Sequence, residues 1–252
     1  MKRILFIAIA MLCTSMCFAQ TTPIDTLAYE DGDYKRLAYV DSLMDEGMYM
    51  SALMLLDSIE VQRKNYLGKE PTFMMFFTRC RIYIQTEEPE ALVSTAEKCF
   101  AIHTGFNLYQ DILYAMQANA YNQLGKYKKA IQAYENAIST NRLKDGREGT
   151  YYCNIASCYL FMEKNNIAEK FFEKGFEILY GYLETTKEEL LRKKVKVDPR
   201  KETILSLMGT HLYQMAYLQK EKGNYAKHKE YLLMSSNAGN EDATKEYKRL
   251  YQ

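Results

Sequence analysis

The sequence predicts an all-α protein, a solenoid of stacked antiparallel helix pairs, and three observations support this prediction. Turn-forming residues are scarce, with 4 Pro and 12 Gly among 252 residues, so the chain has few places to break a helix. Apolar and small residues recur at helical spacing. The same residue pattern returns at a fixed interval, which is typical of a repeat architecture.

The composition is that of an ordinary soluble protein, with 48% hydrophobic and 26% charged residues. Disorder of the whole chain is therefore a poor interpretation. The length suffices for one sizeable domain or one short solenoid. The chain has 22 Tyr and no Trp, and Tyr is suited to filling the space between helices with its hydroxyl group toward water.

Residues 1–19 have the three-part layout of a secretory signal peptide. Lys2 and Arg3 provide the charged start, residues 4–12 an apolar run, and residues 17–19 a small-x-small ending. The apolar run is shorter than the roughly 18 residues that a membrane anchor needs. A lipoprotein signal is disfavoured because a bulky residue precedes each cysteine of this segment.

Cleavage after Ala19 would leave a mature chain that begins at Gln20, without a transmembrane segment. Residues 20–32 would then be a linker and residues 33–252 the repeat domain. We expect a bacterial protein that is periplasmic, secreted or part of the cell envelope. Removing Lys2 and Arg3 changes the formal charge from +1 to −1. A nearly neutral chain has no overall field to hold nucleic acid or anionic lipid.

The clearest repeat lies between Asp111 and Arg142. A turn is predicted at Gly125-Lys126, between two helical segments. Small residues allow the two helices to approach closely, and tyrosines fill the gaps around them. The residues of this pattern are Tyr114, Ala118, Tyr121, Tyr127, Ala130, Tyr134 and Ala137, and we expect all of them except Tyr114 to be buried between helices.

The pattern recurs along the chain. A shift of 38 residues carries Tyr114 onto Tyr152, and the small and aromatic positions are preserved while the turn drifts to Glu163 and Asn165. Three further units are found at lower similarity, and each contains a corresponding small or aromatic series. Their anchors are Val40, Gly47 and Ala52 in the first unit, Cys80, Pro89 and Ala96 in the second, and Ala216, Gly223 and Leu232 in the fifth.

This series resembles the tetratricopeptide repeat. Tyr114 stands where that family favours Trp, and Arg142 where it favours Pro. The resemblance implies a right-handed superhelix of about five helix pairs and a C-terminal capping helix. Residues 231–250 are similar to the related Sel-like repeats. A generic helical bundle with coincidental Ala and Tyr spacing is the alternative.

The fourth and fifth units are separated by extra residues. Residues 170–194 contain no Pro and predict a continuous helix, and Asp198-Pro199 predicts the start of the next helix. We therefore expect a lengthened pair that projects beyond its neighbours. Its tip is basic and suggests either an anionic partner or a solvated helix end whose cations complement the helix dipole. The cations are Arg192, Lys193, Lys194, Lys196, Arg200 and Lys201.

No arrangement of residues indicates catalysis. The three histidines, His103, His211 and His228, form no metal-binding pattern, and no Cys-x-x-Cys, nucleophile elbow or phosphate-binding loop is present. Glu188 and Glu189 are adjacent, so on a helix they point apart. We therefore predict no enzyme activity, no cofactor and no metal site.

In the resembled family, the first helix of each pair lines a concave groove that holds an extended peptide or a partner helix. The residues that the register places there are Asp41, Phe77, Arg81, Gln85, Asn119, Asn122, Asn154 and Ser157. An Asn side chain can both donate to and accept from a peptide backbone, although each could equally be a solvated helix residue. The lysines that would bind an acidic chain terminus are missing at Phe77, Ala115 and Cys153.

The sequence therefore favours an exported, non-catalytic scaffold that binds a protein or peptide. The alternative is an accessory carbohydrate-binding or cell-envelope assembly protein of the bacterial surface. The oligomeric state stays open. Cys80 and Cys99 fall on facing helices of the second unit, where either a disulfide or two buried thiols would fit.

Overall fold

The computed structural model describes residues 31–63, 69–102, 109–143 and 145–252, and within these ranges the chain is helical and contains no strand. The predicted all-α solenoid fold is confirmed. The helices are α2 (Asp31–Asp45), α3 (Tyr49–Arg63), α4 (Lys69–Gln85), α5 (Pro89–Ala101), α6 (Gln110–Gln123), α7 (Tyr127–Thr140), α8 (Arg147–Phe161), α9 (Asn165–Leu183), α10 (Lys187–Arg192), η2 (Pro199–Lys201), α11 (Glu202–Glu221), α12 (Tyr225–Asn237) and α13 (Glu241–Tyr251).

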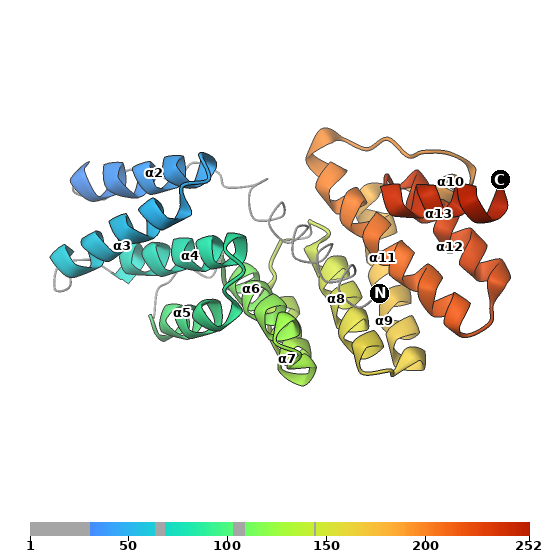
Figure 1. Ribbon diagram of the computed structural model, residues 1–252, viewed down its shortest axis with the longest axis horizontal. Helices are drawn as coiled ribbons and strands as arrows, with labels where there is room; N and C mark the ends of the chain where they lie inside the picture. The colour runs from blue at the N-terminus through green and yellow to red at the C-terminus, as the bar shows by residue number, and fades with distance from the viewer. Residues whose placement is uncertain (1–30, 64–68, 103–108, 144) are drawn as a thin grey trace.

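Consecutive helices pack as pairs: α2 with α3, α4 with α5, α6 with α7, α8 with α9, and α11 with α12. The pairs follow one another along the long axis of the molecule, from α2 at one end to α13 near the other (Figure 1). Helix α13 packs on α12 and follows the last pair. The proposed signal peptide and most of the proposed linker lie outside the described residues.

Each pair turns through the same backbone motif. In the third pair, Gly125 has φ +69°. Its N–H donates to the carbonyl oxygen of Asn122 at 3.0 Å, and the next N–H, of Lys126, donates to that of Tyr121 at 2.8 Å. This is a Schellman helix end. A left-handed residue stands at the corresponding place in all five pairs: Gly47, Glu87, Gly125, Glu163 and Gly223. The turns expected at Gly125 and Glu163 therefore occur there.

Small residues lie where the paired helices touch. Ala118, Ala130 and Ala137 are fully buried, as is the Tyr134 ring, whereas Tyr121 and Tyr127 are half-buried. In the fourth pair the closest approach is between two glycines. A Cβ added to Gly175 would lie 2.7 Å from the carbonyl oxygen of Gly149 and 2.4 Å from Cys153 Sγ. Helices α8 and α9 thus pack at a separation that excludes even a methyl group at this crossing.

The expected continuous helix over 170–194 is wrong. Helix α9 ends at Leu183, and Glu184 takes a left-handed conformation with φ +54°. Thr186 and Glu189 then form a capping box that starts α10, with both side-chain-to-backbone hydrogen bonds at 3.1 Å. Leu190 is fully buried, and its carbonyl oxygen accepts from Asn237 Nδ2 at 2.6 Å. The added residues therefore fold back on α12 instead of projecting as a lengthened pair.

The expected start after Asp198 is present, because the Asp198 side chain accepts from the backbone N–H of Arg200 at 2.9 Å and Pro199 occupies the first helical position. None of the helices in the described ranges is long and apolar enough to cross a membrane.

Candidate partner-binding face

A row of equivalent residues follows the first helices of the pairs. Six residues before each left-handed turn residue stand Asp41 on α2, Arg81 on α4, Asn119 on α6 and Ser157 on α8. The structure brings the first two together: Arg81 Nη1 donates to Asp41 Oδ1 at 2.9 Å. Equivalent positions of neighbouring units thus lie side by side at this end of the solenoid.

The third unit contributes two asparagines. Asn119 Oδ1 accepts from the Tyr134 hydroxyl, so this amide is fixed by the second helix of its own pair. Asn122, one turn further along α6, is only 3% exposed, and its Oδ1 has no hydrogen-bond partner among the residues that the structure describes. A buried amide oxygen without a partner costs free energy in the folded chain. Asn122 is therefore the residue of this row whose amide oxygen has an unused acceptor position.

The fourth unit is different because α11 covers it. Ser157 is buried and its hydroxyl lies 2.7 Å from Gln214 Oε1 of α11. The same hydroxyl also donates to the Cys153 carbonyl oxygen at 3.0 Å. Asn154, one turn earlier on α8, is buried as well. Of these two predicted groove residues, Ser157 is therefore part of the packing between α8 and α11.

Phe77 is also a packing residue. Its buried ring lies 6.0 Å from the Phe73 ring and 5.4 Å from the Tyr109 ring, measured between centroids. Gln85 is half-buried at the end of α4. We therefore define the inner face by the five predicted residues that remain when Phe77, Asn154 and Ser157 are left out: Asp41, Arg81, Gln85, Asn119 and Asn122.

Sequence reasoning missed a polar cluster between α8, α9 and α11. Gln214 Oε1 lies 3.1 Å from Nδ1 of the buried His211, and burial lowers the pKa of His211 to about 4. Gln219 donates to Glu169 Oε1 at 2.7 Å, and Lys222 donates to the other oxygen of that carboxylate. No single-sequence signal identifies Glu169 as the partner of Gln219 and Lys222, because it lies 50 or more residues away from them.

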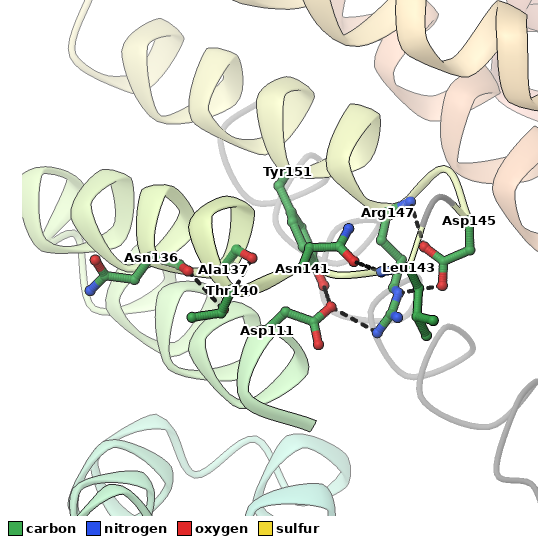
Figure 2. A network of polar contacts seen from close by, with 9 residues as sticks. All are labelled: Asp111, Asn136, Ala137, Thr140, Asn141, Leu143, Asp145, Arg147 and Tyr151. Carbon is green, nitrogen blue, oxygen red and sulfur yellow. Dashed lines mark hydrogen bonds and ion pairs between the residues drawn. The ribbon is translucent and has the colours of Figure 1, made fainter. Parts of the chain in front are cut away.

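A second missed cluster joins α6 to α8 (Figure 2). Arg147 Nη1 lies 2.8 Å from Asp111 Oδ2, and Arg147 Nε lies 2.7 Å from Asp145 Oδ2. Tyr151 donates to Asp111 Oδ2 at 3.3 Å. Burial raises the pKa of Asp111 despite its pairing with Arg147. The cluster connects neighbouring units through buried groups, and its residues are already satisfied by one another.

The basic tip is largely exposed. Arg192, Lys193, Lys194 and Lys196 are exposed to solvent. Arg200 pairs with Asp198 at 2.9 Å, and the half-buried Lys201 pairs with Glu184 at 2.7 Å. The last two cations therefore stabilise the local chain, and the first four remain as the exposed basic tip.

The four cysteines within the described ranges are free, buried thiols. Cys80 and Cys99 do lie on the facing helices α4 and α5, but each thiol donates to a backbone carbonyl oxygen, that of Leu92 and Phe73 respectively. The disulfide that the sequence left open is thus not formed. Burial raises the pKa of Cys99 and of Cys158 to about 12, which keeps these thiols protonated and poorly nucleophilic. In the described part of the chain, no three His, Cys, Asp or Glu residues are grouped to hold a metal.

A tetratricopeptide repeat family model matches residues 109–180, which span α6 through most of α9. No curated protein matches the chain in sequence. The match confirms the resemblance for the third and fourth units, and the Sel-like resemblance of the C-terminal unit stays a prediction.

Three solved structures share the fold. The structure of BtubC (BKLC) from P. vanneervenii has a TM-score of 0.63 and 15% identity, and the alignment covers 98% of this chain and 93% of that one. The apo form of the quorum sensor NprR from B. thuringiensis has a TM-score of 0.60 and 19% identity, covering 88% and 60%. MamA has a TM-score of 0.55 and 14% identity, covering 86% and 99%. At these identities the likeness shows the fold alone.

Proposed function

We propose that this protein is an exported, non-catalytic scaffold that holds an extended segment of a partner protein along the inner face. The observation that carries the proposal is the buried amide oxygen of Asn122, which has no partner in the described chain and lies in a row of polar residues from α2, α4 and α6. Helix-repeat solenoids use such extended surfaces for binding.

The chemistry of the inner face favours an uncharged stretch of backbone. Gln85, Asn119 and Asn122 carry amides, which can donate to and accept from peptide groups. Arg81 is neutralised by Asp41 at 2.9 Å, so this face offers no uncompensated cation to an acidic chain terminus. The fourth unit adds nothing to the contact surface because α11 covers it. We therefore expect a segment that spans the first three units.

Export is part of the proposal and rests on the layout of residues 1–19. The intact mass of the protein purified from its native envelope fraction tests it. A mass that corresponds to a chain beginning at Gln20 is expected, whereas a species that retains residues 1–19 or carries lipid on Cys13 or Cys17 would contradict it.

The binding proposal is tested on partners captured from the same fraction and then prepared in pure form. The variant Arg81→Ala/Gln85→Ala/Asn122→Ala removes three polar groups from the inner face. Each lost hydrogen bond is worth roughly 0.5–1.5 kcal/mol, so affinity should fall about tenfold or more after allowing for non-additivity. Titration calorimetry with the pure partner measures this.

Lys128→Ala, on the exposed side of α7, is the control and should leave the affinity unchanged. A triple variant that melts like wild type and binds its partner equally well would place the binding function elsewhere. Retention of the wild-type protein on glycan arrays without any protein partner would favour the carbohydrate-binding alternative.

A further inference from the structure

The outer side of α3 differs from the same side of the helices that follow. Three, seven, ten and fourteen residues after the left-handed turn residue stand Met50, Met54, Asp57 and Val61, which we call the α3 outer row. The apolar members are 67%, 70% and 78% exposed. The spacing of four, three and four residues places the four side chains in one stripe along the helix.

The repeat register provides an internal comparison. The equivalent residues of the second, third and fourth units are also exposed, so this side of the solenoid faces solvent in the first four units. They are Glu90, Ser94, Glu97 and Ala101 on α5, Lys128, Gln132, Glu135 and Ser139 on α7, and Asn166, Lys170, Glu173 and Glu177 on α9. Among these four units, only the first has large apolar side chains at these positions, although nothing in the repeat requires them there.

From this difference we propose that the α3 outer row docks one amphipathic helix of a partner protein, whose stripe of apolar side chains includes a lysine or arginine that faces Asp57. This surface is distinct from the inner face, and the proposal does not depend on what binds there. The 4-3-4 spacing is that of a helix–helix seam. Met50 and Met54 supply flexible side chains that adapt to a partner's surface.

Charge and size select this occupant over a second copy of the chain. The Asp57 carboxylate is 69% exposed and is held in the stripe by Arg79, at 2.6 Å from Asp57 Oδ1. Arg79 pairs with Glu60 as well, so the two carboxylates and the one guanidinium keep one net negative charge. A paired copy would bring a second Asp57 into the same seam, whereas a basic residue of a partner would complement it. The exposed apolar area of these side chains is a few hundred Å². That is well below the roughly 800 Å² per partner of a stable dimer, but it suits a single docked helix.

The test uses a synthetic helix as the probe. It has the length of α3, 15 residues, with leucines in a seam of the same spacing and a lysine opposite Asp57. A staple on its polar side keeps it helical, because isolated helices of this length are marginal in water. Fluorescence anisotropy measures its binding to the mature protein and to Met50→Lys/Met54→Gln/Val61→Ser, which gives α3 the exposed residues of α7.

Wild type is expected to bind the lysine peptide at least about tenfold more tightly than the triple variant does. A peptide with glutamate in place of that lysine should bind wild type several-fold more weakly, and Asp57→Asn should reduce that difference. The reverse exchange, Lys128→Met/Gln132→Met/Ser139→Val, should create a second site on α7. Because the residues exchanged in the two triple variants are exposed, the thermal melting of these variants should match that of wild type.

Absence of saturable binding by wild type at about 1 mM peptide, or equal binding by the triple variant, would overturn the proposal. Sedimentation equilibrium and flotation with phosphatidylcholine and phosphatidylglycerol vesicles cover the other occupants. A self-association or a vesicle binding that wild type shows and the triple variant lacks would assign the row to a second copy or to a lipid surface instead.

Discussion

Two joints between neighbouring units are each made by an arginine, but their surroundings differ. Arg79 of α4 bridges Asp57 and Glu60 of α3, with both N–O distances at 2.6 Å. Arg147 of α8 bridges Asp111 of α6 and Asp145 (Figure 2). The acceptors of Arg79 are 69% and 39% exposed, whereas Asp111 is only 3% exposed. Removing the partner of a solvent-exposed charge costs little free energy, because water solvates the charge that remains. A buried charge has no water to solvate it, so the same removal costs more.

The two halves of the molecule follow the same contrast. Toward the N-terminus, α2, α3 and α4 are joined by ion pairs whose carboxylates are partly exposed to water. From α8 onward, helices cross at buried glycines and through the hydrogen-bonded Ser157 and Gln214. Where the contact between units is partly exposed, its polar groups can also bind a ligand. Where the contact is buried, residues at the same repeat positions serve only in packing.

The largest effect should come from one substitution made at both joints. Arg147→Met leaves the Asp111 carboxylate buried without its cation, and the free energy of unfolding should fall by about 3–5 kcal/mol. Arg79→Met keeps the apolar stem and frees two carboxylates that water can solvate, so the loss should be about 1 kcal/mol. Urea unfolding of both variants at pH 7 measures the difference. Equal losses would show that the two joints do not differ energetically.

The pH dependence of the Arg147 variant sharpens the same comparison. Burial already raises the pKa of Asp111 in wild type, and removal of Arg147 should raise it further. A carboxyl whose pKa is higher in the folded than in the unfolded chain is destabilising when ionised, and this cost falls as the pH is lowered. The deficit of Arg147→Met relative to wild type should therefore shrink below about pH 5. A deficit that is constant with pH would contradict this account.

The next largest effect on stability should come from the buried His211 of α11, in the C-terminal half of the molecule. Burial lowers the pKa of His211 from 6.5 to about 4. The neutral ring is favoured in the folded chain, so its contribution is present above pH 6.5 and is lost as the pH falls from 6.5 toward 4. The loss should be on the order of 3 kcal/mol. Urea midpoints at pH 7 and pH 4.5 should show a smaller drop for His211→Asn than for wild type. Equal drops would exclude His211 as the cause.

Two glycines of α9 test the close crossing directly. Gly175→Ala places a methyl group against backbone and should cost about 2 kcal/mol. Gly181 lies in the same helix, and a Cβ there would meet nothing within 4 Å. Gly181→Ala should therefore stabilise the protein by about 0.5–1 kcal/mol, since Ala is the better helix former. Thermal melting of the pair is the measurement, and shifts of the same sign would contradict the proposed packing.

The smallest change in stability should come from two turn residues, one in each half of the molecule, and it should be the same for both. Glu87 and Glu163 occupy left-handed turn positions with φ +56° and +59°, where three other pairs have Gly. Glu87→Gly and Glu163→Gly should each stabilise the protein by about 1 kcal/mol, because Gly removes the strain of a side chain in this conformation. Unequal gains, measured by urea unfolding, would show that these turns are not set by local backbone geometry alone.

Much of the fold follows from residues that are close in sequence. The helix pairs and their turns follow from helical periodicity and from residues such as Gly125, because these signals depend on interactions within four or five residues. The break after Leu183 was missed, although Thr186 and Glu189 carry the signal of a capping box. A capping box starts a new helix without any Pro, so the absence of Pro from residues 170–194 does not indicate an unbroken helix.

The candidate site, like the fold, follows only in part from residues that are close in sequence. The register places Asp41, Arg81, Asn119 and Ser157 at equivalent positions of the first helices. Tertiary structure decided which of these positions is accessible: α10 folds back on α12, α11 crosses α8, and Ser157 is buried against Gln214. Sequence periodicity describes one helix and its immediate partner, whereas the exposure of a side chain depends on helices that are 50 or more residues away.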